Sequence, residues 1–164
     1  MRDLSLHILD IVENSIRAGA KEVEIRINED VATDLLEIEI RDDGTGMDQA
    51  TLDNALDPFF TTKSVRKIGL GLSLFQEAAR AAGGDLAIQS EPGKGTQVKA
   101  VFRYSHIDRQ PLGDLARTLQ TLFVANPEVR FRYYHCENGE ECQIDTAEIG
   151  AESRDPHDCV TEKR

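Results

Sequence analysis

Four polar residues near the N-terminus, His7, Asp10, Asn14 and Arg17, are spaced three, four and three positions apart. On an α-helix this spacing places them along one face. The amide oxygen of Asn14, the carboxylate one turn earlier and the guanidinium one turn later could bind hydrated magnesium, a water molecule and a phosphate, respectively. A solvated helix face has the same spacing, so the stripe by itself is compatible with both interpretations.

The stretch from Leu56 to Phe75 has the residue types of a lid over an anion. Glycines let backbone N–H groups approach phosphate oxygens, and the positive end of a following helix favours negative charge. The spacing matches neither a Walker A loop nor a dinucleotide fingerprint. It therefore predicts an anion site of another kind, or an ordinary solvated loop. The basic residues of this stretch are Lys63, Arg66 and Lys67. Its glycine motif, Gly69-Leu70-Gly71-Leu72, stands at the start of a helical pattern.

A third polar group follows a predicted strand, where Arg41-Asp42-Asp43-Gly44-Thr45-Gly46-Met47 forms an acidic, glycine-spaced turn. Such a turn could hold one carboxylate against a ligand N–H group, although Asp-Gly turns are common.

The surrounding pattern predicts the elements that position these groups. Apolar residues at three- and four-residue steps predict an amphipathic helix over 2–17. Alternation predicts strands over 21–28 and 36–40, joined by a turn at Glu29-Asp30, and Asp48 is expected to cap a short helix that ends at Leu56.

Several motifs in one order carry a resemblance to a known family. They are the helix with Asn14, Asp-x-Gly-x-Gly at 42–46, Pro-Phe-Phe-Thr-Thr-Lys at 58–63, Gly-Leu-Gly-Leu at 69–72 and Ser-Glu-Pro-Gly-Lys-Gly-Thr at 90–96. Residues 1–104 thereby resemble the ATP-binding domain of sensor histidine kinases, in the superfamily shared with DNA gyrase B, Hsp90 and MutL. The resemblance implies an α+β fold, a two-layer sandwich of the Bergerat type. Its mixed, mostly antiparallel sheet is covered by helices on one face, and ATP lies under a mobile lid.

The resemblance also implies roles for individual residues. Asn14 is similar to the magnesium-binding asparagine, Arg17 to a phosphate contact, and Asp42 to the aspartate that accepts a hydrogen bond from the adenine amino group. The residues that the resemblance places around the rest of the nucleotide are Gly44, Gly46 and Met47 at the base, Gly69, Leu70, Gly71 and Leu72 near the phosphates, Thr96 on the adenine side, and Lys63, Arg66 and Lys67 in the lid.

The chain departs from the pattern of the ATPase and serine-kinase branches of the superfamily at Asp10. Related ATPases and serine-kinase anti-sigma proteins carry a glutamate base four residues before the asparagine, and Asp10 is one methylene shorter. Asp10 is our candidate catalytic base, with Glu13 as the second choice or a plain surface charge. The strand and helix that usually precede the asparagine helix are absent from the sequence, so we expect another segment to cover that sheet edge.

The segment Ser105-His106-Ile107-Asp108-Arg109-Gln110-Pro111-Leu112 resembles the histidine box of these kinases, but Ile107 replaces its acid and the segment follows the ATP-binding region. We therefore interpret His106 as a loop residue rather than a phospho-acceptor. His7 is expected to be a helper or a core contact.

Residues 105–149 are expected to form an appendage, with a helix over 112–125 and a β-hairpin around Asn138-Gly139. Five residues could form a metal site, but their spacing matches no standard pattern, so we interpret the thiols as incidental: His135, Cys136, Cys142, His157 and Cys159. Residues 150–164 are polar and are predicted to be disordered.

Composition limits the class of protein. A net charge of −11 argues against general binding to nucleic acid or to an anionic membrane. No apolar run approaches the ~20 residues that span a bilayer, and three cysteines suit a reducing cytoplasm. The first hypothesis, which the resemblance implies and the composition permits, is a stand-alone, cytoplasmic Mg-ATP-dependent kinase module for signal transduction that phosphorylates a separate protein partner. The alternative is a regulatory ATPase or ATP-sensing switch, similar to anti-sigma factors or MutL, that controls a partner through lid closure.

Overall fold

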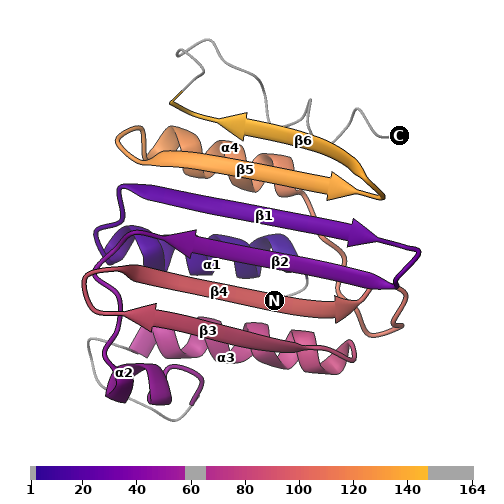
Figure 1. Ribbon diagram of the computed structural model, residues 1–164, viewed down its shortest axis with the longest axis horizontal. Coiled ribbons are helices and arrows are strands. Elements are labelled where there is room, and N and C mark those ends of the chain that lie inside the picture. The colour runs from indigo at the N-terminus through magenta and orange to yellow at the C-terminus, as the bar shows by residue number, and fades with distance from the viewer. Residues whose placement is uncertain (1–2, 58–65, 148–164) are drawn as a thin grey trace.

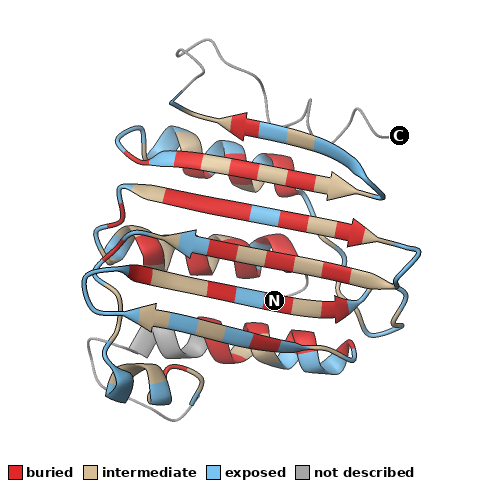
Figure 2. Ribbon diagram, in the orientation of Figure 1, coloured by how far each residue is buried: buried red, intermediate tan, exposed pale blue. Residues whose placement is uncertain are grey.

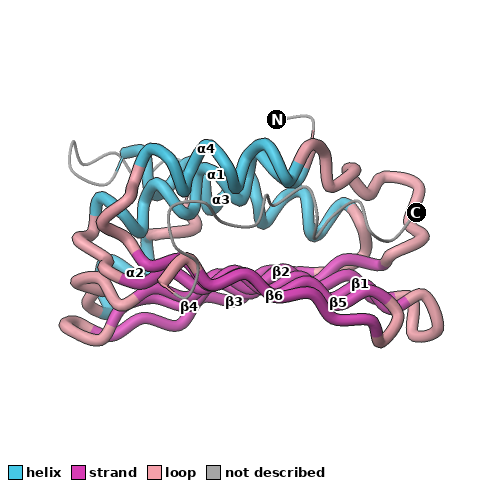
Figure 3. Tube along the Cα trace, turned by 90° about the horizontal axis from the view of Figure 1, so that it is seen from above, coloured by secondary structure: helices cyan, strands magenta, loops and turns pink. Residues whose placement is uncertain are grey.

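The computed structural model describes residues 3–57 and 66–147, with the backbone alone for 66–70. It is a two-layer sandwich in which helices cover one face of a six-stranded sheet (Figures 1 and 3). The strand order is β3-β4-β2-β1-β5-β6. The elements are α1 (Leu4–Arg17), β1 (Glu22–Asp30), β2 (Leu35–Asp42), α2 (Gln49–Asn54), α3 (Arg66–Ala81), β3 (Asp85–Glu91), β4 (Gly95–Arg103), α4 (Leu115–Ala125), β5 (Arg130–Glu137) and β6 (Glu140–Asp145). The α+β sandwich expected from the sequence is confirmed.

Period-two alternation builds the core side of the sheet. In β1 the side chains of Val23, Ile25 and Ile27 are buried under the helices, because successive residues of a strand point to opposite faces. Figure 2 shows the same alternation of buried and more exposed residues along the neighbouring strands. The opposite face carries charged and polar side chains, including the ion pair between Lys99 and Glu37.

The central helix of the covering layer is α1, which contacts α3 on one side and α4 on the other. Its apolar stripe, Leu4, Ile8, Ile11 and Val12, is at most 3% exposed. The Asp3 carboxylate caps the helix by accepting a hydrogen bond from the Leu6 N–H group. The amphipathic pattern of the N-terminal residues thus fixes which side of α1 faces the sheet.

The C-terminal elements extend the same sheet. Strand β5 pairs in parallel with β1, from Glu22 beside Arg130 to Glu29 beside Glu137, and β6 pairs with β5 as a hairpin. Strand β5 therefore covers the sheet edge at β1 for which the sequence predicted another covering segment. The linking segment also docks on α1, since Leu4 and Ser5 donate backbone hydrogen bonds to Pro111 and Leu112.

Several expected boundaries differ from the structure. Strand β1 continues through Glu29 and Asp30, where a turn was expected, because both residues stay paired with β2. Helix α4 begins at Leu115, after a cap by Asp114, rather than at Leu112. Helix α3 begins at Arg66, three residues before Gly69, so the glycine motif lies in its first two turns.

The predicted start of the short helix α2 is confirmed, because the Asp48 side chain accepts a hydrogen bond from the Thr51 N–H group. The tail predicted to be disordered, residues 150–164, lies outside the described residues. Among the helices of the described residues, none is both long enough and apolar enough to cross a bilayer.

Candidate functional site

Asp42 lies at the end of β2, and its carboxylate is held by two donors. The Ser15 hydroxyl donates to Oδ2 at 2.6 Å, and the Gly44 N–H group donates to Oδ1 at 2.9 Å. A carboxylate offers about four acceptor positions, so two remain for a ligand. Asp42 is only partly buried, and its fixed orientation suits the recognition of one N–H donor.

Hydroxyl groups on the neighbouring strands border Asp42. Thr96, the residue predicted on the adenine side, is its direct partner across the β2–β4 ladder. The Thr96 hydroxyl lies 2.8 Å from the Ser90 hydroxyl, which also accepts a hydrogen bond from the Met47 N–H group at 2.8 Å. The structure therefore brings Asp42, Met47 and Thr96 together.

Two glycines allow the loops around Asp42 to pack this closely. Gly46 has a φ of +70°, and a Cβ atom there would lie 2.0 Å from the Glu91 carbonyl oxygen. Gly95 has a φ of +96°, and its Cβ atom would lie 2.0 Å from the Asp42 carbonyl oxygen. Real Cβ atoms do not approach an oxygen so closely, so both positions require glycine.

The polar stripe of α1 lies beside this turn. Asn14 is partly buried, and its Oδ1 atom lies 3.4 Å from an Arg17 guanidinium nitrogen. Arg17 is also 3.8 Å from Glu13, with both side chains nearly half exposed. Glu13 is thus part of a surface pair, as its alternative interpretation expected.

Asp10 points toward α3. Its Oδ2 atom lies 3.3 Å from the position that a Cβ atom on Gly71 would occupy. A side chain at residue 71 would therefore require the Asp10 carboxylate to shift by a few tenths of an ångström. The candidate base and the Gly-Leu-Gly-Leu motif consequently lie side by side.

The remaining predicted lid residues divide into three groups. Leu72 is 3% exposed and belongs to the core. The basic residues Arg66 and Lys67, expected in the lid, lie in the first turn of α3. Gly69 lies in the same turn, and Leu70 follows it. Lys63 and the preceding Pro-Phe-Phe motif lie outside the described residues.

The two histidines weighed from the sequence have different surroundings. His7 is 2% exposed, stacks on Phe75 with ring centroids 5.2 Å apart and pairs with Gln110. Its burial lowers its pKa below the ordinary value of 6.5. His106 lies in the loop after β4, where its Nδ1 atom accepts a hydrogen bond from the Asp108 N–H group.

Sequence reasoning missed two serines. Ser15 was interpreted as part of the apolar stripe of α1, and Ser90 only as part of a motif. A hydroxyl within a buried helical stripe is a signal for Ser15, because a buried hydroxyl needs a hydrogen-bond partner. Ser90 offers no comparable signal, because its partners are Met47, far away in the sequence, and Gly95 and Thr96 on the next strand.

The fold and site together define a class: a helix-covered sheet with an acidic, glycine-bounded turn at one end and an Asp/Asn stripe on the central helix. Residues 2–106 match the family described as histidine kinase-, DNA gyrase B-, and HSP90-like ATPase. The chain belongs to this family and carries its ATP-binding, kinase-like domain.

Similar proteins of known sequence include sensor kinases. A putative sensor protein of Shewanella frigidimarina is 35% identical over 103 residues, which are 62% of this chain and 16% of that protein. The sensor protein kinase FleS of Pseudomonas aeruginosa is 42% identical over 89 residues, which are 54% of this chain and 22% of FleS. The matched region is thus about a fifth or less of these relatives.

Two solved structures share the fold at 18% identity. The N-terminal domain of a DNA repair protein matches with a TM-score of 0.62, covering 98% of this chain and 57% of that chain. The MutL ATPase domain of Aquifex aeolicus, complexed with ADP, matches with a TM-score of 0.53, covering 88% of this chain and 63% of that chain.

Proposed function

We propose that the chain binds Mg-ATP, with Asp42 accepting a hydrogen bond from the adenine amino group and Asn14 binding the magnesium ion. The observation that carries the proposal is the Asp42 carboxylate, which Ser15 and Gly44 hold in place while two acceptor positions stay available. An aspartate fixed in this way distinguishes an amino group from a carbonyl group, because it only accepts hydrogen bonds. Magnesium and the basic residues at the start of α3 then offset the phosphate charge.

The reaction that we propose is transfer of the γ-phosphate to a separate protein in the cytoplasm. A nucleophile of the partner attacks the γ-phosphorus, the bond to the bridging oxygen breaks, and ADP leaves. For a hydroxyl acceptor, Asp10 takes its proton; for a histidine acceptor, Asp10 only orients a water molecule. The similarity to sensor kinases at 35–42% identity supports this reaction.

A second candidate is a regulatory ATPase whose lid controls a partner. The position of Asp10 favours it, because a carboxylate against the second turn of α3 is suitably placed to activate a water molecule near phosphates bound at that helix. In this case phosphate is released to water and the nucleotide state determines partner binding.

The first experiment measures nucleotide binding. Asp42→Asn places an NH₂ group against the adenine amino group, and we expect ATP affinity to fall about 100-fold, since hydrogen bonds to charged groups contribute about 1.5–3 kcal/mol. Asp43→Asn is the matched control. Asp43 bears the same charge but accepts from the N–H groups of Lys21 and Glu22 instead. Equal ATP affinity of both variants in calorimetry would contradict the proposed role of Asp42.

The second experiment separates the two reactions. The protein is incubated with γ-labelled Mg-ATP, alone and with extract of the host cell, and labelled protein and free phosphate are followed together. Label on a protein that disappears with Asp42→Asn would support the kinase, and free phosphate without labelled protein would support the ATPase. Acid or base stability of the label separates phosphohistidine from phosphoserine.

Asp10→Asn tests the base. We expect the rate of hydrolysis, or of transfer to a hydroxyl, to fall about 10²–10⁴-fold while ATP affinity changes little, because the variant loses only the proton acceptor. The control is Glu13→Gln, which removes the same charge one turn further along α1 from an exposed pair with Arg17. Unchanged turnover of the Asp10 variant would remove Asp10 from the mechanism.

A further inference from the structure

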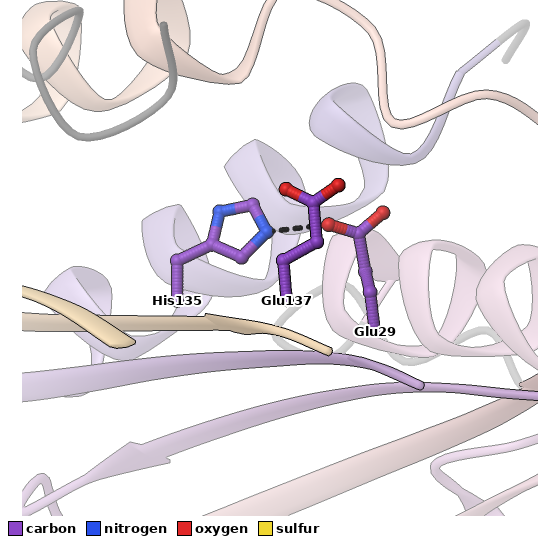
Figure 4. Close-up of side chains that lie close together, drawn as sticks. All are labelled: Glu29, His135 and Glu137. Atoms are coloured by element: carbon purple, nitrogen blue, oxygen red, sulfur yellow. Dashed lines mark hydrogen bonds and ion pairs between the residues drawn. The ribbon is translucent and has the colours of Figure 1, made fainter. Parts of the chain in front are cut away.

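Three potential metal ligands meet at the end of the sheet away from Asp42. Glu29 is near the end of β1, and His135 and Glu137 are near the end of β5. Their ligand atoms all lie within 4.8 Å of one another. Figure 4 shows the three side chains rising from the strands on the same side of the sheet, toward the helices.

The parallel register of β1 and β5 produces this cluster. Glu29 is the direct neighbour of Glu137, and Ile27 is the direct neighbour of His135. Residues two apart in a strand point to the same face, so His135 and Glu137 both lie on the side of Glu29. His135 is 5% exposed and Glu29 is 8% exposed, while Glu137 is partly exposed.

A divalent cation would offset the charges of the cluster. Two carboxylates side by side on neighbouring strands repel each other, and burial increases the cost. The Nε2 atom of His135 lies 2.6 Å from the Oε2 atom of Glu29, so one proton lies in a hydrogen bond between them. A divalent ion bound by two carboxylates and a neutral imidazole makes a site without net charge.

The second nitrogen of His135 is arranged as in known metal sites. Its Nδ1 atom lies 2.8 Å from the hydroxyl oxygen of Tyr133, whose side chain is fully buried. Histidines that bind a metal through one nitrogen commonly donate the other N–H group to a fixed acceptor, which sets the tautomer and the ring orientation. The Tyr133 hydroxyl can accept this hydrogen bond once Nε2 binds a metal, and Nε2 faces the carboxylates.

Backbone hydrogen bonds hold the two strands in position. The Asn138 N–H group donates to the Glu29 carbonyl oxygen at 2.8 Å, and the Asn138 side chain accepts from the Val31 N–H group at 2.9 Å. Asn138 and Gly139 have positive φ angles of 51° and 88°, which suit a two-residue hairpin turn. The hairpin therefore fixes Glu137 against the end of β1.

We propose that Glu29, His135 and Glu137 bind a divalent transition-metal ion of the Zn²⁺ type, with water in the fourth position. Nitrogen and carboxylate ligands at about 2.0–2.1 Å around a tetrahedral ion lie about 3.3 Å apart. The proton between His135 and Glu29 is then replaced by the metal, and this pair opens by less than an ångström. The imidazole separates this site from magnesium sites, which use oxygen ligands.

The bound ion ties the β5–β6 hairpin to β1, at the opposite end of the sheet from the nucleotide residues. The inference is independent of the proposed function, because no residue is shared between the two sites.

The test uses metal-free, full-length protein titrated with Zn²⁺ and, separately, Co²⁺. We expect one ion per chain in calorimetry and a higher unfolding temperature with Zn²⁺. The Co²⁺ complex should have visible d–d bands of tetrahedral type without thiolate charge-transfer absorption. A thiolate band, or the lack of 1:1 binding, would overturn the proposal.

Variants assign the ion to these residues. Glu137→Gln should weaken Zn²⁺ binding at least tenfold, and His135→Gln should abolish it. Glu141→Gln, an exposed residue in the same hairpin, removes the same charge and should leave binding unchanged. Because His135 is buried, the Glu137 variant decides the matter if the His135 variant does not fold. Wild-type affinity of Glu137→Gln would identify the cluster as a plain ion pair.

Discussion

The covered face of the sheet carries two polar clusters at opposite ends. One surrounds Asp42, which lies opposite Val23 in the β1–β2 ladder, and the other surrounds Glu29, which lies opposite Leu36 in the same ladder. Both contain carboxylates fixed by hydrogen bonds from neighbouring elements. They differ in what surrounds them.

The Asp42 cluster is built from a helix, a glycine-bounded turn and three strands, and the Asp42, Ser90 and Thr96 side chains stay partly exposed. The Glu29 cluster is carried by two strands alone, and two of its three members are buried. An accessible, partly satisfied carboxylate suits a ligand that enters and leaves. A buried acid–histidine pair suits a permanent structural connection, with or without an ion.

The largest effect is expected at the turn that supports Asp42. Gly95→Ala should lower the free energy of unfolding by roughly 3 kcal/mol or more, because its Cβ atom would lie 2.0 Å from the Asp42 carbonyl oxygen and the backbone must shift. The remaining folded protein should bind ATP weakly, since the same shift displaces Asp42. Chemical denaturation and calorimetry measure the two effects.

Gly93→Ala is the control for this prediction. Gly93 has a φ of +78°, and a Cβ atom there meets nothing within 4 Å. Only the backbone conformation opposes alanine, at a cost of about 1–2 kcal/mol. Equal destabilisation by the two variants would mean that the close approach at residue 95 is unimportant.

An intermediate effect is expected at the other cluster, in the presence of a chelator. A double-mutant cycle with Glu29→Gln and His135→Gln should give a coupling energy of about 1–3 kcal/mol, because the pair is buried and hydrogen-bonded. The matched cycle on the exposed pair Glu13 and Arg17 should give at most about 0.5 kcal/mol. Coupling energies of the same size in the two cycles would contradict the prediction that the buried pair is stronger than the exposed pair.

The smallest effect concerns His7, between α1 and α3. In the folded protein, burial lowers the pKa of His7 below 6.5. As the pH falls through that value, the unfolded chain therefore binds more protons at His7 than the folded protein does. The free energy of unfolding should therefore decrease from pH 7 toward pH 5, and His7→Gln should make this decrease smaller. His106→Gln is the control, because that side chain lies in a loop and is 27% exposed. A steeper pH dependence in the His7 variant would contradict the assignment.

The sequence by itself determined the sandwich and most of the Asp42 cluster. Helix periodicity placed Asp10, Asn14 and Arg17 on one side of α1, and the alternation of β1 and β2 placed Asp42 at a strand end. These features are local: each depends on residues within a turn or a strand of one another. The order of the motifs then indicated the family without any knowledge of long-range contacts.

The tertiary structure alone decided which distant residues meet. Ser90 joins the Asp42 cluster through bonds to Met47 and Thr96, and Asp10 meets Gly71 across the α1–α3 contact. Glu29 was expected in a turn, and its meeting with His135, 106 positions later, required the parallel pairing of β5 with β1. Alternation shows which face a side chain occupies, but not which strand pairs beside it or in which register. That choice depends on packing of the whole sheet, and it created the second cluster.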